Sequence, residues 1–379
     1  MRSFIPLLLL AACNAGGDAV ESNAEAAAPA VGGRPFAVRP IATFDEPWAM
    51  AFLPGPGPRA LITEKKGKLK LLWSDVGRVG EVAGAPAVDY GGQGGFGDVV
   101  LHPRFAQNRL VYLSWVEAGE GGNRGAVVGR ARFMEDGNRP RLENLQIIWR
   151  QSPKLSGRGH YGHRIAFGPD GKLYVSNGDR QEFTPAQDMT GTLGKIVRLN
   201  DDGTVPADNP FANRGAAAAQ IWSLGHRNPL GLAFDGSGRL WDIEMGPKGG
   251  DELNLVERGR NYGYPIVSNG DHYDGKDIPD HKTRPEFAAP KVWWTPVISP
   301  GDMIFYSGSA FPGWRGDILI AGLSSKALIR IDVNGDSARE AERWDMGKRI
   351  REVEQGPSGS VYLLEDGEGG RLLKLTPAK

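Results

Sequence analysis

The sequence contains one cysteine, Cys13, among its 379 residues, so it cannot form an internal disulfide bond. It also has no excess of charge of one sign, because 45 Lys and Arg side chains balance 45 Asp and Glu side chains. A chain without a basic surplus is not typical of nucleic-acid-binding proteins, and we expect no nucleic acid partner. The longest N-terminal apolar run is far shorter than the roughly 20 residues of a membrane span.

Several catalytic motifs are absent as well. The six histidines form no HExxH pair, which argues against a zinc enzyme. No GxSxG or SxxK pattern supports serine acyl chemistry. No GxGxxG follows a strand and opens a helix, so a nucleotide-binding fold is not indicated. The chain also lacks CxxCH, and we therefore expect no covalently attached haem.

The N-terminus is typical of an exported protein. Arg2 precedes the short apolar run Ile5–Ala12, and Leu10-Ala11-Ala12-Cys13 resembles the lipobox of bacterial lipoproteins. We predict a signal peptide over residues 1–13, with Cys13 lipidated and the protein periplasmic or elsewhere in the cell envelope. The membrane is then a partner only through the lipid. An ordinary signal peptide that contains a cysteine is the alternative. Residues 14–34 lack aromatic side chains, which predicts a flexible tether.

The rest of the chain, residues 35–379, repeats one unit of two strands. An apolar strand, a turn rich in Gly, Pro or Asp and a second strand recur. The clearest copies are Arg164–Val175 and Gly231–Trp241, and the others start near 48, 98, 302 and 351. Six copies spaced by about 60 residues leave room for four-stranded blades of roughly 40–45 residues plus loops. We therefore predict an all-β fold, a six-bladed β-propeller; a β-sandwich is the weaker alternative.

The longest intervals between copies, at 66 to 71 residues, lie between the second and fifth copies. Loops at one mouth of a propeller are suited to carry a binding site. His160 lies in such a loop, directly before the third copy, and its ordinary pKa near 6.5 suits a general base. A surface histidine is the alternative interpretation.

Three further segments carry polar groups. Arg227 and Asn228, in Gly225–Pro229, offer donors for an anionic or carbonyl ligand, or form a structural turn. The Gly- and Pro-rich loop from Glu244 to Glu252 offers oxygen ligands for calcium, or is a solvated acidic turn. Arg349 and Arg351 alternate on a strand and so share one face, which favours a bound dicarboxylate or phosphate over a salt-bridged outer face.

These segments together resemble the soluble PQQ-dependent (pyrroloquinoline quinone-dependent) glucose and aldose sugar dehydrogenases of the glucose/sorbosone dehydrogenase family. The resemblance covers nearly everything after Pro35. It rests on Gly225–Pro229, on Met245–Gly263, on Leu199–Pro210, and on Gln93-Gly-Gly95 with Leu101-His-Pro103. It implies a six-bladed propeller that oxidises the C1 hydroxyl of aldoses to lactones. Electrons would pass to an external acceptor, a cytochrome or a quinone.

The resemblance also implies residue roles. His160 matches the catalytic base, and Arg227 matches the residue that stabilises charge on the reduced quinone. The predicted PQQ-binding residues are Gln93, His160, Arg227, Asn228, Arg349 and Arg351, with Ser324 at the position of a cofactor-contacting lysine and Lys326 two residues away. The carbonyl groups of Gly246 and Pro247 match ligands of a cofactor-bound calcium. Glu252, Tyr262 and Asp271 match ligands of a second, structural calcium, and Trp294 matches an aromatic residue near the substrate.

Two other functions stay open from the sequence. A calcium-dependent propeller lactonase or hydrolase would need acidic metal ligands in the central channel. A non-catalytic extracellular binding module would keep the fold without the cofactor, and the serine at position 324 is compatible with that.

Overall fold

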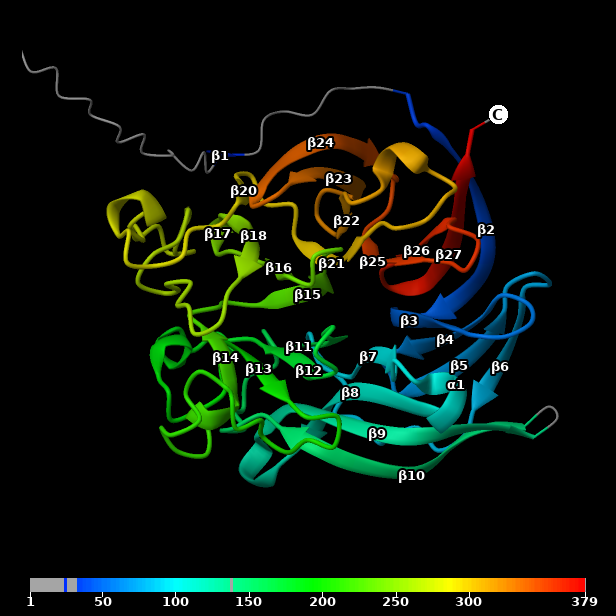
Figure 1. The fold of residues 1–379 in the computed structure, drawn as a ribbon, viewed down its shortest axis with the longest axis horizontal. Helices are drawn as coiled ribbons and strands as arrows, with labels where there is room; N and C mark the ends of the chain where they lie inside the picture. The colour runs from blue at the N-terminus through cyan, green and yellow to red at the C-terminus, as the bar shows by residue number, and fades with distance from the viewer. Residues whose placement is uncertain (1–23, 26–32, 137–138, 379) are drawn as a thin grey trace, which may run out of the picture.

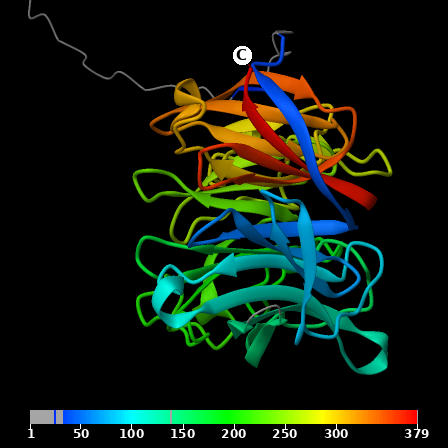
Figure 2. The ribbon, with the colours of Figure 1, turned by 90° about the vertical axis from the view of Figure 1, so that its right-hand side faces the viewer.

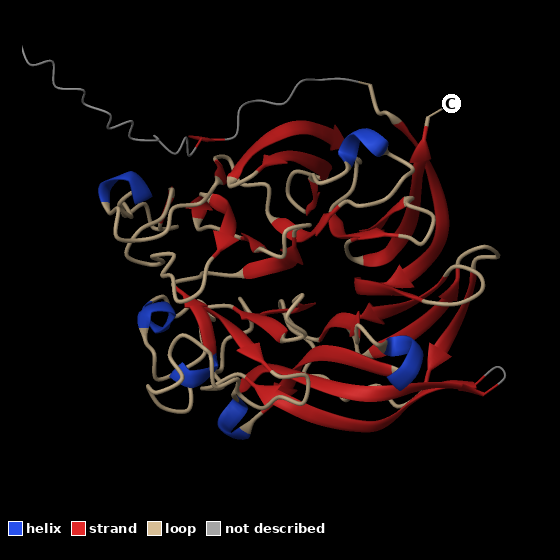
Figure 3. Ribbon diagram, viewed as in Figure 1, coloured by secondary structure: helices blue, strands red, loops and turns tan. Residues whose placement is uncertain are grey.

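The computed structural model describes residues 24–25, 33–136 and 139–378. Regular structure in these ranges is almost entirely β-strand (Figure 3). The short helical turns are α1 (Phe105–Asn108), η1 (Glu120–Gly122), η2 (Thr184–Gln187), η3 (Ala218–Gln220), η4 (His281–Thr283) and η5 (Pro312–Trp314). Among the described residues, no helix has the length and apolar character to cross a membrane. The predicted signal peptide and Cys13 lie outside the described residues.

The strands form six four-stranded antiparallel sheets, or blades, around one axis (Figure 1). Blade 1 contains β3 (Pro47–Leu53), β4 (Arg59–Glu64), β5 (Lys68–Trp73) and β6 (Arg78–Val82). Blade 2 contains β7 (Phe96–Leu101), β8 (Leu110–Ala118), β9 (Arg124–Asp136) and β10 (Arg139–Arg150). Blade 3 contains β11 (Gly162–Phe167), β12 (Leu173–Asn177), β13 (Lys195–Leu199) and β14 (Ile221–Leu224).

The second half of the chain forms the other three blades. Figure 2 shows the stacked, twisted sheets from the side. Blade 4 contains β15 (Pro229–Phe234), β16 (Leu240–Glu244), β18 (Asp251–Val256) and β20 (Val292–Trp294). Blade 5 contains β21 (Pro300–Phe305), β22 (Ile318–Gly322), β23 (Ala327–Asn334) and β24 (Ser337–Asp345). Blade 6 contains β25 (Ile350–Gln355), β26 (Val361–Glu365), β27 (Glu368–Pro377) and β2 (Phe36–Asp45). The predicted six-bladed propeller is confirmed.

Two smaller pairings complete the sheets. β17 (Lys248–Gly249) pairs with β19 (Gly270–Asp271) in the loops of blade 4. β1 (Ala24–Glu25) pairs in parallel with the outer edge of β20. Of the predicted tether, the structure describes only β1 and residues 33–34.

The ring is closed by strands from the two ends of the folded region. β2 pairs antiparallel with β27 along its length, so blade 6 combines the first long strand with the last three. Phe36, at the start of β2, packs edge-on against Trp314 and Trp344 of blade 5. A propeller needs such a closure because each blade otherwise leaves one face uncovered.

The predicted two-strand unit is the inner hairpin of each blade. Its turn returns in similar form in blades 3, 4 and 6, with Gly171, Gly238 and Gly359 at positive φ. A glycine adopts that backbone conformation without steric cost, which is why these turns end in glycine. The core lies between the blades: within the described residues, six hydrophobic clusters each join one pair of neighbouring blades.

Every inner strand carries a register irregularity near its first residues. The shifts occur at Pro47/Ala49, Phe96/Val99, Gly162/Ile165, Pro229/Gly231, Pro300/Asp302 and Ile350/Glu352. A bulge re-aims side chains out of the regular alternation. Trp48, His163 and Arg351 lie at these shifts, and all three line one cavity, which is described below.

Candidate active site at the mouth of the central channel

Two adjoining cavities lie where the inner strands begin. The one on the axis, which we call the central cavity, has a volume of about 260 Å³. Its lining includes Glu46, Trp48, Lys65, Gln93, His163, Asn228, Leu323, Arg349, Arg351 and Asp366. Four of the predicted cofactor-binding residues, Gln93, Asn228, Arg349 and Arg351, come from three different parts of the sequence and share this cavity.

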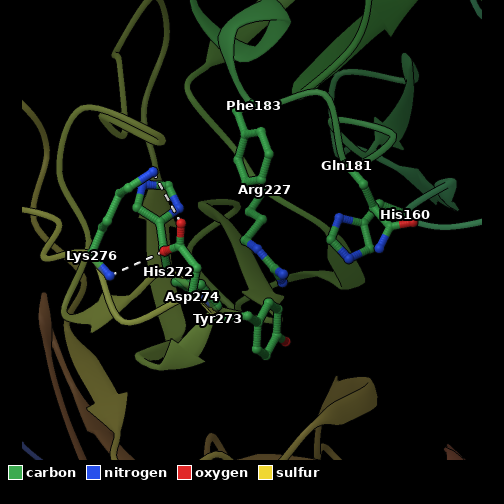
Figure 4. A pocket seen from close by; sticks show the side chains of 9 residues that line it. His160, Gln181, Phe183, Arg227, His272, Tyr273, Asp274 and Lys276 are labelled. Carbon is green, nitrogen blue, oxygen red and sulfur yellow. Dashed lines mark hydrogen bonds and ion pairs between the residues drawn. The ribbon is translucent and has the colours of Figure 1, made fainter.

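The second, which we call the side cavity, has a volume of about 390 Å³ and is formed by the long loops of blades 3 and 4. His160, Gln181, Phe183, Arg227, Pro247, His272, Tyr273, Asp274 and Lys276 line it (Figure 4). In this view the Arg227 side chain extends between His160 on one side and the His272–Lys276 turn on the other. The insertions that the sequence singled out thus supply its walls.

His160 is held in a fixed orientation by two neighbours. It has a positive φ of 47° after the glycine-rich segment, and its N–H donates to Gln93 Oε1 at 2.7 Å. Its Nδ1 lies 2.7 Å from Oδ1 of the fully buried Asp179. When Nδ1–H donates to that carboxylate, Nε2 carries the lone pair and can accept a proton.

The pKa of His160 lies below its ordinary value. Burial is the largest cause, Asp179 opposes it, and the nearby Arg227 lowers the pKa further. The imidazole is therefore neutral at neutral pH, which is the form a general base needs.

Arg227 reaches the side cavity from the β14–β15 loop. Its Nη1 donates to the carbonyl groups of Met245 at 2.9 Å and Gly246 at 2.5 Å. Its Nε is buried and has no hydrogen-bond partner among the described residues. A buried guanidinium N–H without an acceptor is costly, so this group is available to a ligand.

Glu244, the last residue of β16, fixes the backbone beneath Arg227 and Asn228. Its Oε2 accepts the N–H of Arg227 at 2.6 Å and of Asn228 at 3.2 Å. Nδ1 of the buried His226 lies 3.1 Å from both Glu244 and Asp242. Burial opposes a charge on His226, but the two carboxylates outweigh it and raise its pKa to about 9. The cluster is thus an ion-paired support under the site.

Arg349 and Arg351 lie on the same side, as the sequence predicted, and bracket one carboxylate. Arg349 Nε is 2.8 Å from Asp366 Oδ2, and Arg351 Nε is 2.9 Å from Asp366 Oδ1. Burial lowers the pKa of Arg351, while the two arginines hold that of Asp366 below its usual value in spite of burial. Two cations thus share one anion at the wall of the central cavity.

The predicted calcium loop is tightly folded. The N–H groups of Gly246 and Ser299 donate to Asp251 at 2.9 and 2.6 Å. A Cβ on Gly246 would lie only 2.0 Å from the Gly250 carbonyl oxygen, so the loop requires glycine there. The Gly246 carbonyl oxygen accepts from Arg227 Nη1, and its second lone pair stays available to a calcium ion.

Two of the three residues predicted for the second calcium lie on either side of His281. Nε2 of His281 is 3.1 Å from the Tyr262 carbonyl, and its unpartnered Nδ1 faces Glu252 Oε1 at 3.8 Å. Two acceptors that face each other fit a cation between them. The Tyr262 hydroxyl donates to the Leu255 carbonyl, which leaves only its backbone oxygen for an ion. Asp271 lies on the surface in β19.

A comparison with protein families matches residues 44–374 to the family described as Glucose / Sorbosone dehydrogenase. The chain belongs to this family. It is 41% identical over 340 residues to the aldose sugar dehydrogenase YliI of Escherichia coli, covering 88% of this chain and 90% of that protein.

Solved structures agree with the family assignment. The apo-form of the soluble aldose sugar dehydrogenase from E. coli matches with a TM-score of 0.84 and 38% identity, covering 90% of this chain and all of that one. The PQQ-bound aldose sugar dehydrogenase from Streptomyces coelicolor matches with a TM-score of 0.73 and 28% identity, covering 92% of this chain and 99% of that one. The chain is thus an oxidoreductase of the sugar dehydrogenase type.

Three of the residues predicted for this Glucose / Sorbosone dehydrogenase family member, Trp294, Ser324 and Lys326, are not among the residues that line the two cavities. The Trp294 ring is 2% exposed in the core between blades 4 and 5, and its Nε1 donates to Glu340. Alternation along the short strand β20 directs Trp294 inward. Ser324 is exposed and donates to the Val297 carbonyl, and Leu323 is the residue of the Leu323–Lys326 turn that lines the central cavity.

Sequence reasoning missed Asp179 and Asp366 as parts of this site, and it named Glu244 only as the start of the predicted calcium loop. One signal could have found Asp179 and Asp366. In an antiparallel hairpin the end of the second strand lies beside the start of the first. Polar residues just after the second strand of each copy therefore reach the same mouth as His160.

Proposed function

We propose that this chain oxidises the C1 hydroxyl of aldose sugars to the lactone, with PQQ as the hydride acceptor. The observation that carries this proposal is the pairing of a neutral, Asp179-oriented His160 with Arg227 in one cavity, beside a second cavity with arginines on its wall. The similarity to a PQQ-bound aldose sugar dehydrogenase supports it.

His160 accepts the proton in this reaction. Nε2 takes the proton of the anomeric hydroxyl as the C1–H bond breaks, and the resulting imidazolium is stabilised by the Asp179 carboxylate at 2.7 Å. Gln93, which holds the His160 N–H, keeps the ring facing the side cavity. The oxygen and carbon of the sugar then form the lactone carbonyl, and two electrons leave with the hydride.

Arg227 stabilises negative charge. Its guanidinium lies in the side cavity with one buried N–H free of a partner. In a site from which water is excluded, a fixed cation beside a developing oxyanion lowers the barrier without reorganisation. Asn228, whose Oδ1 accepts the Gly162 N–H at 3.2 Å, holds the base of the central cavity.

The donor set fits PQQ, which supplies a two-electron hydride acceptor when it is bound. PQQ is a planar tricarboxylate, and Arg349 and Arg351 offer it two guanidinium groups that now share a single carboxylate. Gln93 and Asn228 add amide groups on the same lining. The carbonyl groups of Gly246 and Pro247 are hard oxygen donors of the kind calcium prefers. Ser324 and Lys326 are not needed in this assignment.

The direct test is reconstitution. We expect purified protein with PQQ and Ca²⁺ to reduce an artificial dye when glucose or another aldose is added, and to lose activity when calcium is chelated. His160→Ala should still bind PQQ but lose turnover. Absence of any PQQ absorbance change together with absence of aldose turnover would contradict the proposal. The acceptor in the cell, a cytochrome or a quinone, would take the electrons from the reduced cofactor.

We also propose that the protein is exported and held in the cell envelope through a lipid on Cys13. This rests on the sequence alone, since Cys13 is outside the described residues. Cys13→Ser should move the protein from the membrane fraction to the soluble envelope fraction. An unchanged distribution would instead favour an ordinary signal peptide.

A further inference from the structure

Lys65 is a cation in the central cavity to which no role has been assigned. It follows β4, the second strand of blade 1, and lines the cavity together with Arg349 and Arg351 of blade 6. Its backbone is fixed on both sides, because its N–H donates to the Glu46 carbonyl and its own carbonyl accepts the Phe96 N–H. The side chain therefore starts from a rigid position between blades 1 and 2.

The ammonium group of Lys65 contacts a carbonyl oxygen and an aromatic ring. Its Nζ donates to the Gly92 carbonyl at 3.1 Å and lies 5.6 Å from the centre of the Tyr90 ring. Within the described residues, no Asp or Glu forms an ion pair with it, and the nearby Glu46 accepts from the Tyr90 hydroxyl instead. Burial is the largest cause that lowers the pKa of Lys65 and Arg351 lowers it further, while Glu46 and Asp366 oppose them. In this environment the Lys65 ammonium group can form an ion pair with an anionic ligand.

The charges on the cavity wall support the same interpretation. Three cations, Lys65, Arg349 and Arg351, face two carboxylates on this wall: Asp366, which both arginines already share, and Glu46, which accepts the Tyr90 hydroxyl. The Leu323–Lys326 turn adds only the apolar Leu323 to the wall. The turn therefore does not supply the lysine that the resemblance places at position 324. Lys65 of blade 1 supplies a lysine to this cavity instead.

We infer that Lys65 is a cofactor-binding residue of the central cavity, the third cation of a cradle for a polycarboxylate. This rests on the proposed function, with PQQ as the ligand. Lys65 then supplies the positive charge that the resemblance assigns to a lysine at position 324. Its bond to Gly92 also ties the ammonium to the glycine-rich segment that carries Gln93.

The test is a PQQ binding titration by calorimetry, which needs no turnover. Lys65→Met should weaken PQQ binding about tenfold and reduce its dependence on salt, because one ionic contact is lost. Lys65→Arg should restore most of the affinity. Lys66→Met is the matched control and should bind PQQ as the wild type does, since Lys66 is exposed and pairs with Asp45 at 2.9 Å.

Lys65→Gln separates charge from loop positioning. Glutamine can still donate to the Gly92 carbonyl but carries no charge, so we expect it to bind PQQ as weakly as Lys65→Met. Wild-type affinity in Lys65→Gln, or in Lys65→Met with an unchanged melting temperature, would overturn the inference and leave the proposed function intact. A wild-type protein that does not bind PQQ would overturn both.

Discussion

His160 and Arg227 come from loops before neighbouring blades, and their environments set their different roles. The imidazole is kept neutral by burial and by the guanidinium nearby, while Asp179 fixes which nitrogen bears the proton. The Arg227 guanidinium donates to the carbonyl groups of Met245 and Gly246, which hold it in the side cavity. A base and a fixed cation can thus act on one substrate without neutralising each other.

Asp179→Asn tests the orientation of His160. Because Asp179 raises the pKa of His160, its loss should lower that pKa further and move the acidic limb of kcat/KM to lower pH. Loss of orientation should also reduce kcat by about 10²- to 10⁴-fold. A pH–rate profile of both proteins measures the two effects. An acidic limb that does not move would show that His160 is not the titrating base.

Tyr273 is the exposed tip of the turn that covers the side cavity. The turn is closed by the bond from the His272 N–H to the Lys276 carbonyl, and the Tyr273 ring lies 5.8 Å from the Arg227 guanidinium carbon. We expect Tyr273→Ala to raise KM for aldoses about fivefold or more with little change in kcat, because an aromatic wall contributes binding rather than chemistry. Steady-state kinetics against several aldoses measures this. A fall in kcat at unchanged KM would contradict it.

At the scale of the element, the inner hairpin explains why the site lies at one end of the ring. The first strand starts and the second strand ends at the same mouth, so both segments present residues to the cavities. His160 and Asp179 meet in this way in blade 3, and Arg351 and Asp366 do so in blade 6. The bulges near the start of each inner strand turn further side chains toward the axis.

The Gly246 loop should tolerate no side chain. A Cβ at Gly246 would clash with the carbonyl oxygens of Gly249 and Gly250, which cannot rotate away as a side chain would. We expect Gly246→Ala to abolish calcium binding at this loop and to lower the melting temperature. Gly236→Ala is the control, because a Cβ there has no atom within 4 Å. Calcium titration and thermal unfolding of both variants distinguish a local effect from a general one, and equal behaviour would contradict the prediction.

At the scale of the whole molecule, Arg164 joins the blades around the axis. It belongs to β11 of blade 3 and is buried. Its guanidinium contacts are Trp48 of blade 1 (4.0 Å to the ring centre), Asp98 of blade 2 (3.5 Å), the Leu230 carbonyl of blade 4 (2.7 Å), the Gly301 carbonyl of blade 5 (2.6 Å) and Glu352 of blade 6 (3.3 Å). This one side chain of blade 3 therefore contacts each of the other five blades.

Arg164→Met should destabilise the fold by about 3–5 kcal/mol, because it leaves buried carboxylates without their counter-charge. Burial raises the pKa of Asp302 to about 7 and of Glu354 to about 8 even with Arg164 present. Raised carboxyl pKa values contribute stability that is full below about pH 4 and is lost as the pH rises through 7 to 8.

The deficit of Arg164→Met should accordingly be largest near pH 8 and smallest near pH 5. Urea unfolding at both pH values measures it. Arg339→Met, which removes an exposed ion pair with Asp332, serves as the control and should change little. A deficit that does not depend on pH would argue that lost packing, rather than charge, is responsible.

Ring closure gives a second prediction at this scale. A chain that starts after Asp45 lacks β2 and should fail to show a cooperative thermal transition, because β27 and the Trp344 side of blade 5 lose their cover. A chain that starts at Arg34 should melt as the full chain does. Circular dichroism of the two truncations decides this, and a cooperative transition in the shorter chain would contradict it.

The sequence by itself determined the number of blades and the loops that bear the site. Turn chemistry and strand alternation are local, so the inner hairpins with Gly171 and Gly238 were readable in the chain, and so were His160, Arg227 and the paired arginines beside strands. The burial of Trp294 could not be read from the sequence, because it depends on the neighbouring blade, which no local pattern specifies.

The tertiary structure alone decided which of these residues meet. Closure of the ring brings Met50 to Glu352 across 302 positions and Arg164 to Glu352 across 188. It likewise brings Lys65 into one cavity with Arg349 and Arg351, both of which pair with Asp366. Such pairings depend on the twist, bulges and order of six sheets together. They could not be predicted from the sequence, because no single segment determines its distance to another blade.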